Sequence, residues 1–240
     1  MKNYLTLIAI LFMANACFTA CDSSNENSEQ PKLTNEEIDR AKLKMLDEKF
    51  STQWTEDERK QAASAASVDY LSTTEKEVFY YLNLMRLNPP RFAQTYALEY
   101  NGDTGWRKDY GFDERKQSLL KDLSTLESLP LLQPSFPLYE FAECFATNAG
   151  AQGPDLKDPH NRKGTGCPEN LELNEWEECL DFGGCYSGYA IVMHCLIDAG
   201  INNGGLEHRK TLFEPKYASM GVAIRPNKKY QRMAVIDFSN

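Results

Sequence analysis

Three histidines are the residues of this sequence best suited to metal binding or acid–base chemistry: His160, His194 and His208 all lie in the final third of the chain. A glutamate, Glu169, lies among them in the run Pro168-Glu169-Asn170-Leu171. Imidazole and carboxylate groups are ligands that a divalent ion such as zinc accepts. The spread of these residues predicts a site that the fold assembles, and the alternative is that they are unrelated surface or helix-capping groups.

Composition excludes several other kinds of chemistry. The chain of 240 residues has a formal net charge of −9, which disfavours nucleic-acid binding because that requires clustered Lys and Arg. The hydrophobic and charged fractions are 42% and 25%, as in ordinary globular proteins. Phosphate-binding glycine loops and the HExxH, GxSxG and CxxC patterns do not occur.

The N-terminus predicts export. Lys2 precedes an apolar run, Tyr4 to Met13, that is too short to span a bilayer, and residues 1–20 are therefore predicted to be a lipoprotein signal peptide. Cys21 is the expected lipidation site, with Cys17 as the competing one, and the polar residues 21–32 form a tether. We expect a bacterial envelope protein that a lipid holds to a membrane, the outer membrane or the cell surface.

Export places the cysteines in an oxidising compartment, where disulfides form. Cys179 and Cys185 are the candidate pair, because the glycines between them could close a small loop. Cys144 lies among apolar residues of an expected helix, so it is the candidate for a buried free thiol. The alternative is that all five cysteines beyond residue 21 are simply small buried residues.

The elements that must position the histidines are mostly helical. Residues 33–71 are charge-rich, and Thr34 with Glu37 and Thr55 with Glu58 have the spacing of capping boxes. The main domain is predicted over 72–240. Helices are expected over 74–88, 91–100, 112–129, from Ser135, and over 190–199, whereas residues 150–185 show little regular pattern. The chain is expected to end in a hairpin, 217–225 and 230–238.

Several runs of the C-terminal part resemble one family. They are Leu196-Ile197-Asp198-Ala199-Gly200-Ile201, then His208-Arg209-Lys210-Thr211-Leu212-Phe213-Glu214-Pro215-Lys216-Tyr217, Met220-Gly221-Val222-Ala223 and Pro168-Glu169-Asn170-Leu171. They are similar to motifs of the CAP superfamily, which contains cysteine-rich secretory proteins, antigen 5 and plant pathogenesis-related proteins. The resemblance implies an α+β fold, an α-β-α sandwich of the CAP type, here with extra N-terminal helices.

The same resemblance implies a cleft with two histidines and two acids. His160, Glu169 and His208 occupy three of these places, whereas the place of the fourth acid falls near Ala190. His194 lies one helical turn later, and one hypothesis is that it replaces the acid, so that three histidines bind zinc beside Glu169. The alternatives are that His194 is a hydrogen-bonded core residue, or that another acid completes the set: Glu175, Glu177, Glu178 or Asp198.

Three functions are compatible with these residues. The first is a lipid-anchored CAP module whose cleft binds a small ligand, lipid, glycan or protein. The second is a metal-dependent, peptidase-like hydrolase in which Glu169 is the general base for a zinc-bound water. The third is a structural envelope protein that interacts through its charged N-terminal helices.

Overall fold

The computed structural model describes residues 34–102, 111–153, 158–171, 175–183, 186–199 and 205–240. Residues 34–240 belong to one compact unit, and the signal peptide and Cys21 lie outside the described residues. Helices surround a four-stranded mixed sheet, which confirms the α+β class. In the part described, no helix has the length and apolar character needed to cross a membrane.

The first two helices begin where the capping boxes predict. Helix α2 (Asn35–Phe50) follows Thr34, and helix α3 (Glu56–Ala62) follows Thr55. In both, the threonine side chain accepts from the backbone of the glutamate three residues later, and that glutamate accepts from the threonine backbone. These reciprocal bonds satisfy amides that a helix leaves without partners.

The expected N-terminal extension is not a separate part of the fold. Leu43, Phe50 and Trp54 are buried in the same apolar core as the later helices. Ser64 also donates to the carbonyl of Leu132, far along the chain, at 2.8 Å. The helical extension therefore packs within the same compact unit as the residues that follow it.

The next helices lie largely within the ranges predicted from the sequence. Helix α4 (Thr73–Leu87) ends before two prolines, and the helix expected over 91–100 is a short α5 (Pro89–Phe92) continued by a π-helix, η1 (Ala93–Ala97). Helix α7 (Phe112–Thr125) and helix α8 (Phe136–Gln152) follow. The last helices are α9 (Gly188–Ile197) and α10 (Glu207–Phe213).

The sheet has the order β1-β3-β4-β2. Strands β3 (Ser219–Asn227) and β4 (Gln231–Ser239) form the predicted C-terminal hairpin. Strand β2 (Trp176–Gly183) pairs antiparallel with β4 at the edge, and the two-residue β1 (Gln133–Pro134) is parallel to β3. Strands β1 and β2 were not expected, because β2 lies in a segment without regular hydrophobic alternation.

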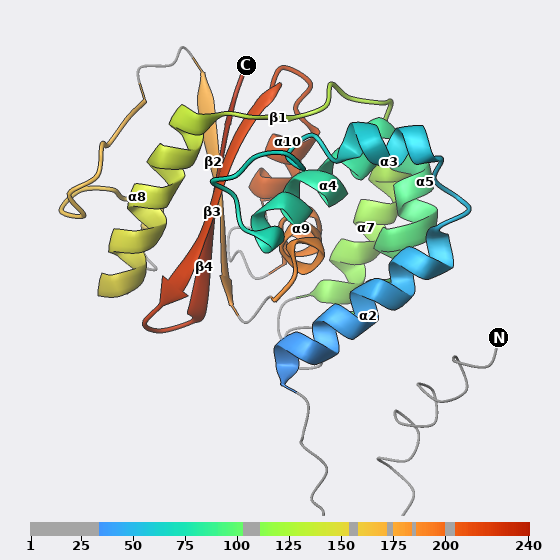
Figure 1. The fold of residues 1–240 in the computed structure, drawn as a ribbon, viewed down its shortest axis with the longest axis horizontal. Coiled ribbons are helices and arrows are strands. Elements are labelled where there is room, and N and C mark those ends of the chain that lie inside the picture. Colours follow the sequence, from blue (N-terminus) through green and yellow to red (C-terminus); the bar gives the residue numbers. More distant parts are fainter. Residues whose placement is uncertain (1–33, 103–110, 154–157, 172–174, 184–185, 200–204) are drawn as a thin grey trace, which may run out of the picture. The chain divides into compact units, whose positions relative to one another are not determined.

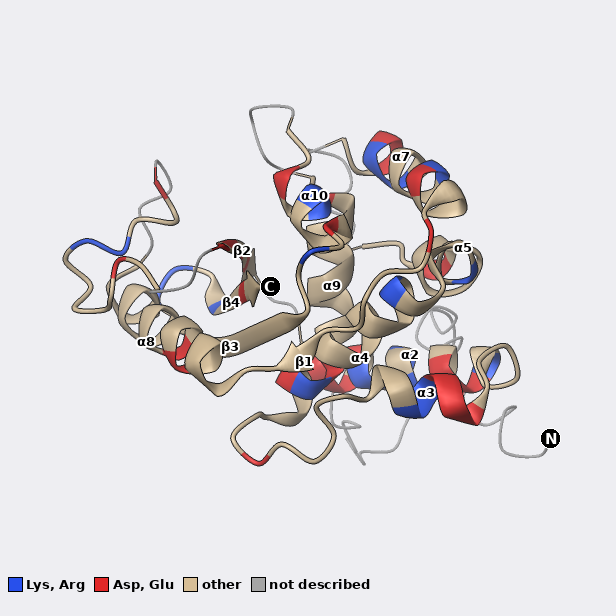
Figure 2. Ribbon diagram, turned by 90° about the horizontal axis from the view of Figure 1, so that it is seen from above, with Lys and Arg blue, Asp and Glu red and all other residues tan. Residues whose placement is uncertain are grey.

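The helices cover both faces of the sheet (Figures 1 and 2). Helix α8 packs on one face through Ala142, Phe145 and Ala149, which contact an apolar cluster with Leu180 and Val235. Helices α4, α9 and α10 belong to the opposite layer. The result is a three-layer arrangement of helix, sheet and helices.

Close contact between α8 and β3 depends on one glycine. A Cβ atom at Gly221 would lie 2.2 Å from the carbonyl carbon of Leu138 and 2.3 Å from the backbone nitrogen of Tyr139. Only a residue without a side chain fits between the strand and the backbone of the helix at this distance.

Candidate functional site

His160 faces solvent, but a buried acid holds its ring. Its Nδ1 lies 2.8 Å from Oε1 of Glu178, and the side chains are 47% and 4% exposed. An ionised carboxylate can only accept, so Nδ1 carries the proton and Nε2 of the neutral ring is left to accept from a ligand. The pair is a solvent-facing imidazole with a fixed orientation.

A buried guanidinium contacts the acid of this His160–Glu178 pair from the protein interior. Arg162 donates to Glu178 and lies 3.4 Å from Oδ2 of Asp237, and its side chain is 2% exposed. Its guanidinium carbon lies 3.6 Å from the ring centroid of Phe141 on α8. Burial, together with the neighbouring charge of Glu178, raises the pKa of Asp237. Two acids, Glu178 and Asp237, therefore lie against one buried guanidinium.

His194 contacts the other face of the same strand. Its Nδ1 lies 3.0 Å from Oδ1 of Asp181, and the side chains are 14% and 11% exposed. Glu178 and Asp181 are three residues apart in β2, and an odd separation places two side chains on opposite faces of a strand. His160 and His194 therefore bind partners on opposite faces of the edge strand.

His208 has a third, separate partner. Its Nδ1 lies 3.1 Å from Oδ1 of Asp198, and its backbone amide donates to Oδ2 of the same residue at 3.1 Å. Asp198 has φ 56°, a left-handed conformation that ends α9 and turns its carboxylate toward the first residues of α10. The acid thus holds both the ring and the backbone of His208.

Arg209, the neighbour of His208, joins three helices. Its side chain is 2% exposed and donates to the carbonyls of Leu196 and Arg115, at 2.6 and 2.9 Å. It also pairs with Asp122 of α7 at 2.9 Å. The His-Arg run therefore stabilises the packing of α7, α9 and α10.

Among the described residues, each histidine pairs with a different acid. Glu169 is exposed, and within the same residues it has no hydrogen bond to any of the three histidines. Within the described residues, no group of three or more His, Cys, Asp or Glu side chains could hold a metal ion. A zinc site of His160, His194, His208 and Glu169 stays a prediction, and among the described residues His160 and His194 contact opposite faces of β2.

Sequence reasoning had named two of the acids that pair with histidines, Glu178 and Asp198, only as alternatives. It missed Asp181 and the polar role of Asp237, and it had noted Arg162 only as a polar neighbour of His160. Asp237 precedes Phe238 in a run that is otherwise apolar, and an acid in such a run is a signal of a buried polar network. Its partners could not be inferred, since β2 was not predicted.

The cysteine predictions need correction. Cys144 is not a free thiol, because it forms a disulfide with Cys167. The Cα atoms of the two cysteines are 5.8 Å apart. Cys179 is a buried free thiol in β2 instead of a partner of Cys185, and Cys185 itself lies outside the described residues. The disulfide joins α8 to the end of the segment that carries His160 and Arg162. Burial raises the pKa of both remaining described thiols, Cys179 and Cys195.

Comparison with known proteins adds no family assignment: no family model, curated protein or solved structure matches the chain.

Proposed function

We propose that this chain is an exported, lipid-anchored binding module of the CAP type, which recognises its ligand through His160. The helix–sheet–helix layering and the position of the His-Arg run at the start of α10 support this family assignment. A disulfide between Cys144 and Cys167 suits an oxidising compartment outside the cytoplasm. Attachment through Cys21 would place the module on a membrane of the bacterial envelope.

The observation that carries the binding role is the fixed, exposed imidazole of His160. Glu178 orients the ring, and Arg162 and Asp237 hold Glu178 in the interior. A group that is already fixed loses little conformational entropy when a ligand hydrogen-bonds to it. This arrangement provides recognition chemistry without requiring a metal ion.

The test compares His160→Gln with His194→Gln in the full chain, because His194 has the same kind of acid partner on the opposite face of β2. Binding is measured on a glycan array and on vesicles of defined lipid composition. We expect one ligand class to bind the native chain, and at least about tenfold weaker binding for His160→Gln only. Equal binding by the native chain and His160→Gln would contradict the proposal.

A hydrolase remains the second candidate, and one observation favours it. An acid-oriented imidazole with a free Nε2 is also the arrangement of a general base. In that case, hydrolysis of peptide or ester substrates should disappear in both His160→Gln and Glu178→Gln. The predicted base, Glu169, has no contact with the pair, so Glu169→Gln should retain the activity. Activity that survives loss of His160 would eliminate this candidate.

A further inference from the structure

A cavity of about 500 Å³ lies where α2 and the α2–α3 connection meet α4 and η1. Its volume is within the range of small-molecule sites. It involves none of the three histidines. Aromatic and aliphatic side chains line it together with three basic and three acidic ones: Leu43, Phe50, Trp54, Tyr80, Tyr96, Arg40, Lys44, Arg59, Asp47, Glu48 and Glu77, with Ser51.

One side of this cavity presents a carboxylate that lacks a cation. Asp47 accepts hydrogen bonds from the hydroxyls of Tyr81 and Tyr96, at 2.8 and 2.9 Å. Throughout residues 34–240 as described, no Lys, Arg or His forms an ion pair with it. Arg40, which also lines the cavity, is engaged by Glu77 and Thr74. Burial raises the pKa of Asp47, which is the expected cost of an anion without a countercharge.

Another part of the lining presents donors without an acid. Arg59 donates to the carbonyls of Ser51, at 2.6 Å, and of Trp54, and it pairs with no described carboxylate. Trp54 is 2% exposed, and its indole Nε1 has no hydrogen-bond partner in the described structure. A buried donor without a partner is uncommon, since it loses its bond to water. An acceptor from a ligand would satisfy it.

The charges of both Asp47 and Arg59 act on Tyr80, which also lines the cavity. Burial and the charge of Asp47 raise the pKa of Tyr80 to about 12, while the charge of Arg59 acts in the opposite direction. Asp47, Arg59, Trp54 and Tyr80 all line this one cavity, so the acid and the donors face the same space.

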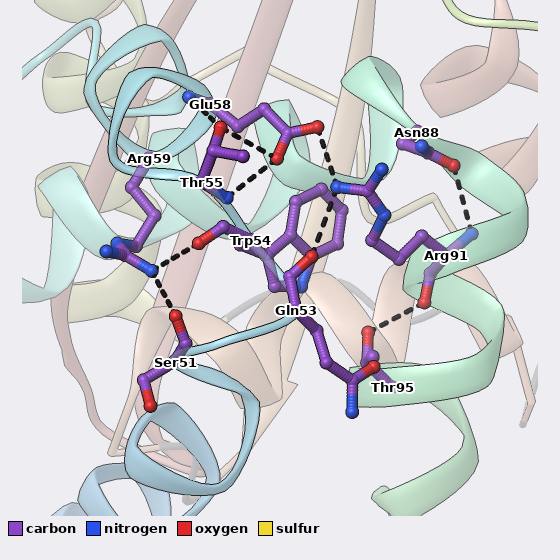
Figure 3. Close-up of polar contacts among 9 residues, drawn as sticks. All are labelled: Ser51, Gln53, Trp54, Thr55, Glu58, Arg59, Asn88, Arg91 and Thr95. Atoms are coloured by element: carbon purple, nitrogen blue, oxygen red, sulfur yellow. Dashed lines mark hydrogen bonds and ion pairs between the residues drawn. The ribbon is translucent and has the colours of Figure 1, made fainter.

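The wall that contains Trp54 is held rigidly (Figure 3). Arg91 covers the Trp54 ring at 4.9 Å from its centroid and donates to the carbonyl of Gln53 at 3.2 Å. The same guanidinium pairs with Glu58 at 2.6 Å, and Asn88 caps the short helix that carries Arg91. These contacts hold the α2–α3 connection that carries Trp54 in place.

We propose that this cavity binds a small zwitterion, with an ammonium group at Asp47 and a carboxylate or phosphate at Arg59 and the Trp54 indole. The three basic and three acidic lining residues give a net charge of 3 − 3 = 0 in a chain of net charge −9, which suits a ligand without net charge. The ammonium supplies the countercharge that Asp47 lacks, next to the aromatic rings of Tyr80 and Tyr96. The anionic group accepts from the unsatisfied indole of Trp54 and supplies the acid that Arg59 lacks among the described residues.

The test is calorimetric titration of the full chain, in non-ionic detergent, with two zwitterions: the dipeptide Ala-Leu and sn-glycero-3-phosphoethanolamine. N-acetyl-Ala-Leu and Ala-Leu-amide each lack one charge. We expect saturable binding of at least one zwitterion. If Ala-Leu binds, each blocked dipeptide should bind at least about tenfold more weakly. Binding by Ala-Leu alone identifies a peptide-type carboxylate as the anionic group, and binding by sn-glycero-3-phosphoethanolamine alone identifies a phosphodiester, as in a lipid headgroup.

Variants separate recognition from folding. Asp47→Asn keeps an acceptor for both tyrosines but removes the charge, so it should abolish zwitterion binding while the thermal transition is retained. Trp54→Phe keeps an aromatic ring without the indole donor and should weaken binding. Asp69→Asn, an exposed acid outside the cavity, is the matched control, and His160→Gln should also bind normally, which separates this site from the proposed one. Absence of saturable binding by both zwitterions, or unchanged binding in folded Asp47→Asn, overturns the proposal.

Discussion

Replacing both Cys144 and Cys167 with serine should destabilise the protein by an amount that follows from the length of the loop they close. The sequence separation is 23 residues. In the chain-entropy model, a crosslink over such a loop stabilises the folded state by about 3 kcal/mol, because it restricts the unfolded chain. Both side chains are half-buried, so the smaller serine should add little further cost.

The effect should be concentrated in the segment that carries His160 and Arg162. Arg162 still pairs with buried Glu178 after the crosslink is removed, so the segment should loosen without detaching. Hydrogen exchange should accelerate over residues 158–171 and remain slow in the β3–β4 hairpin. This local loss of order should also weaken any ligand that depends on the fixed orientation of His160.

Urea unfolding followed by circular dichroism measures the free energy difference. Dithiothreitol should lower the stability of the native chain to that of the double variant and leave the variant itself unchanged, which controls for the serine substitutions. Equal unfolding free energies for the two proteins under oxidising conditions would refute the reasoning, since they would show that the crosslink does not restrict the unfolded chain.

Three further predictions concern the interior. Arg86→Met should lower the free energy of unfolding by about 4 kcal/mol in urea, because the fully buried guanidinium donates to four backbone carbonyls that would lose their partner. Gly221→Ala should cost about 2 kcal/mol or more, since the new methyl group would overlap the backbone at Leu138; an unchanged melting temperature would show that α8 can shift freely. Asp47→Asn should gain stability relative to the native chain as the pH rises from below 3.8 to neutral. The raised pKa of Asp47 means that the folded state retains a proton that the unfolded state has released, so the native chain loses stability through this window. Thermal melting of both proteins at the two pH values measures the difference, and a pH-independent difference would contradict this assignment.

The sequence by itself determined the elements that depend on neighbouring residues. The capping boxes at Thr34 and Thr55 located two helix starts, and the turn residues between 226 and 229 located the C-terminal hairpin. Such signals are local, because the hydrogen-bond partners lie within a few positions of each other. Helix α2 also carries a signal of the cavity. Asp47 lies at helical spacing between Leu43 and Phe50, and the fold buries both of these apolar residues.

Tertiary structure decided which residues share a site. Strand β2 is stabilised by pairing with β4, about 60 residues later, and its alternation sends Glu178 toward His160 and Asp181 toward His194. The family resemblance predicted one cleft for the histidines, whereas His160 and His194 contact opposite faces of the edge strand. The cavity at Asp47 likewise exists only because α2 packs against α4 and η1. Pairing between distant segments depends on which surfaces become buried and on the entropy of closing long loops. Neither of these appears as a local pattern in a single sequence.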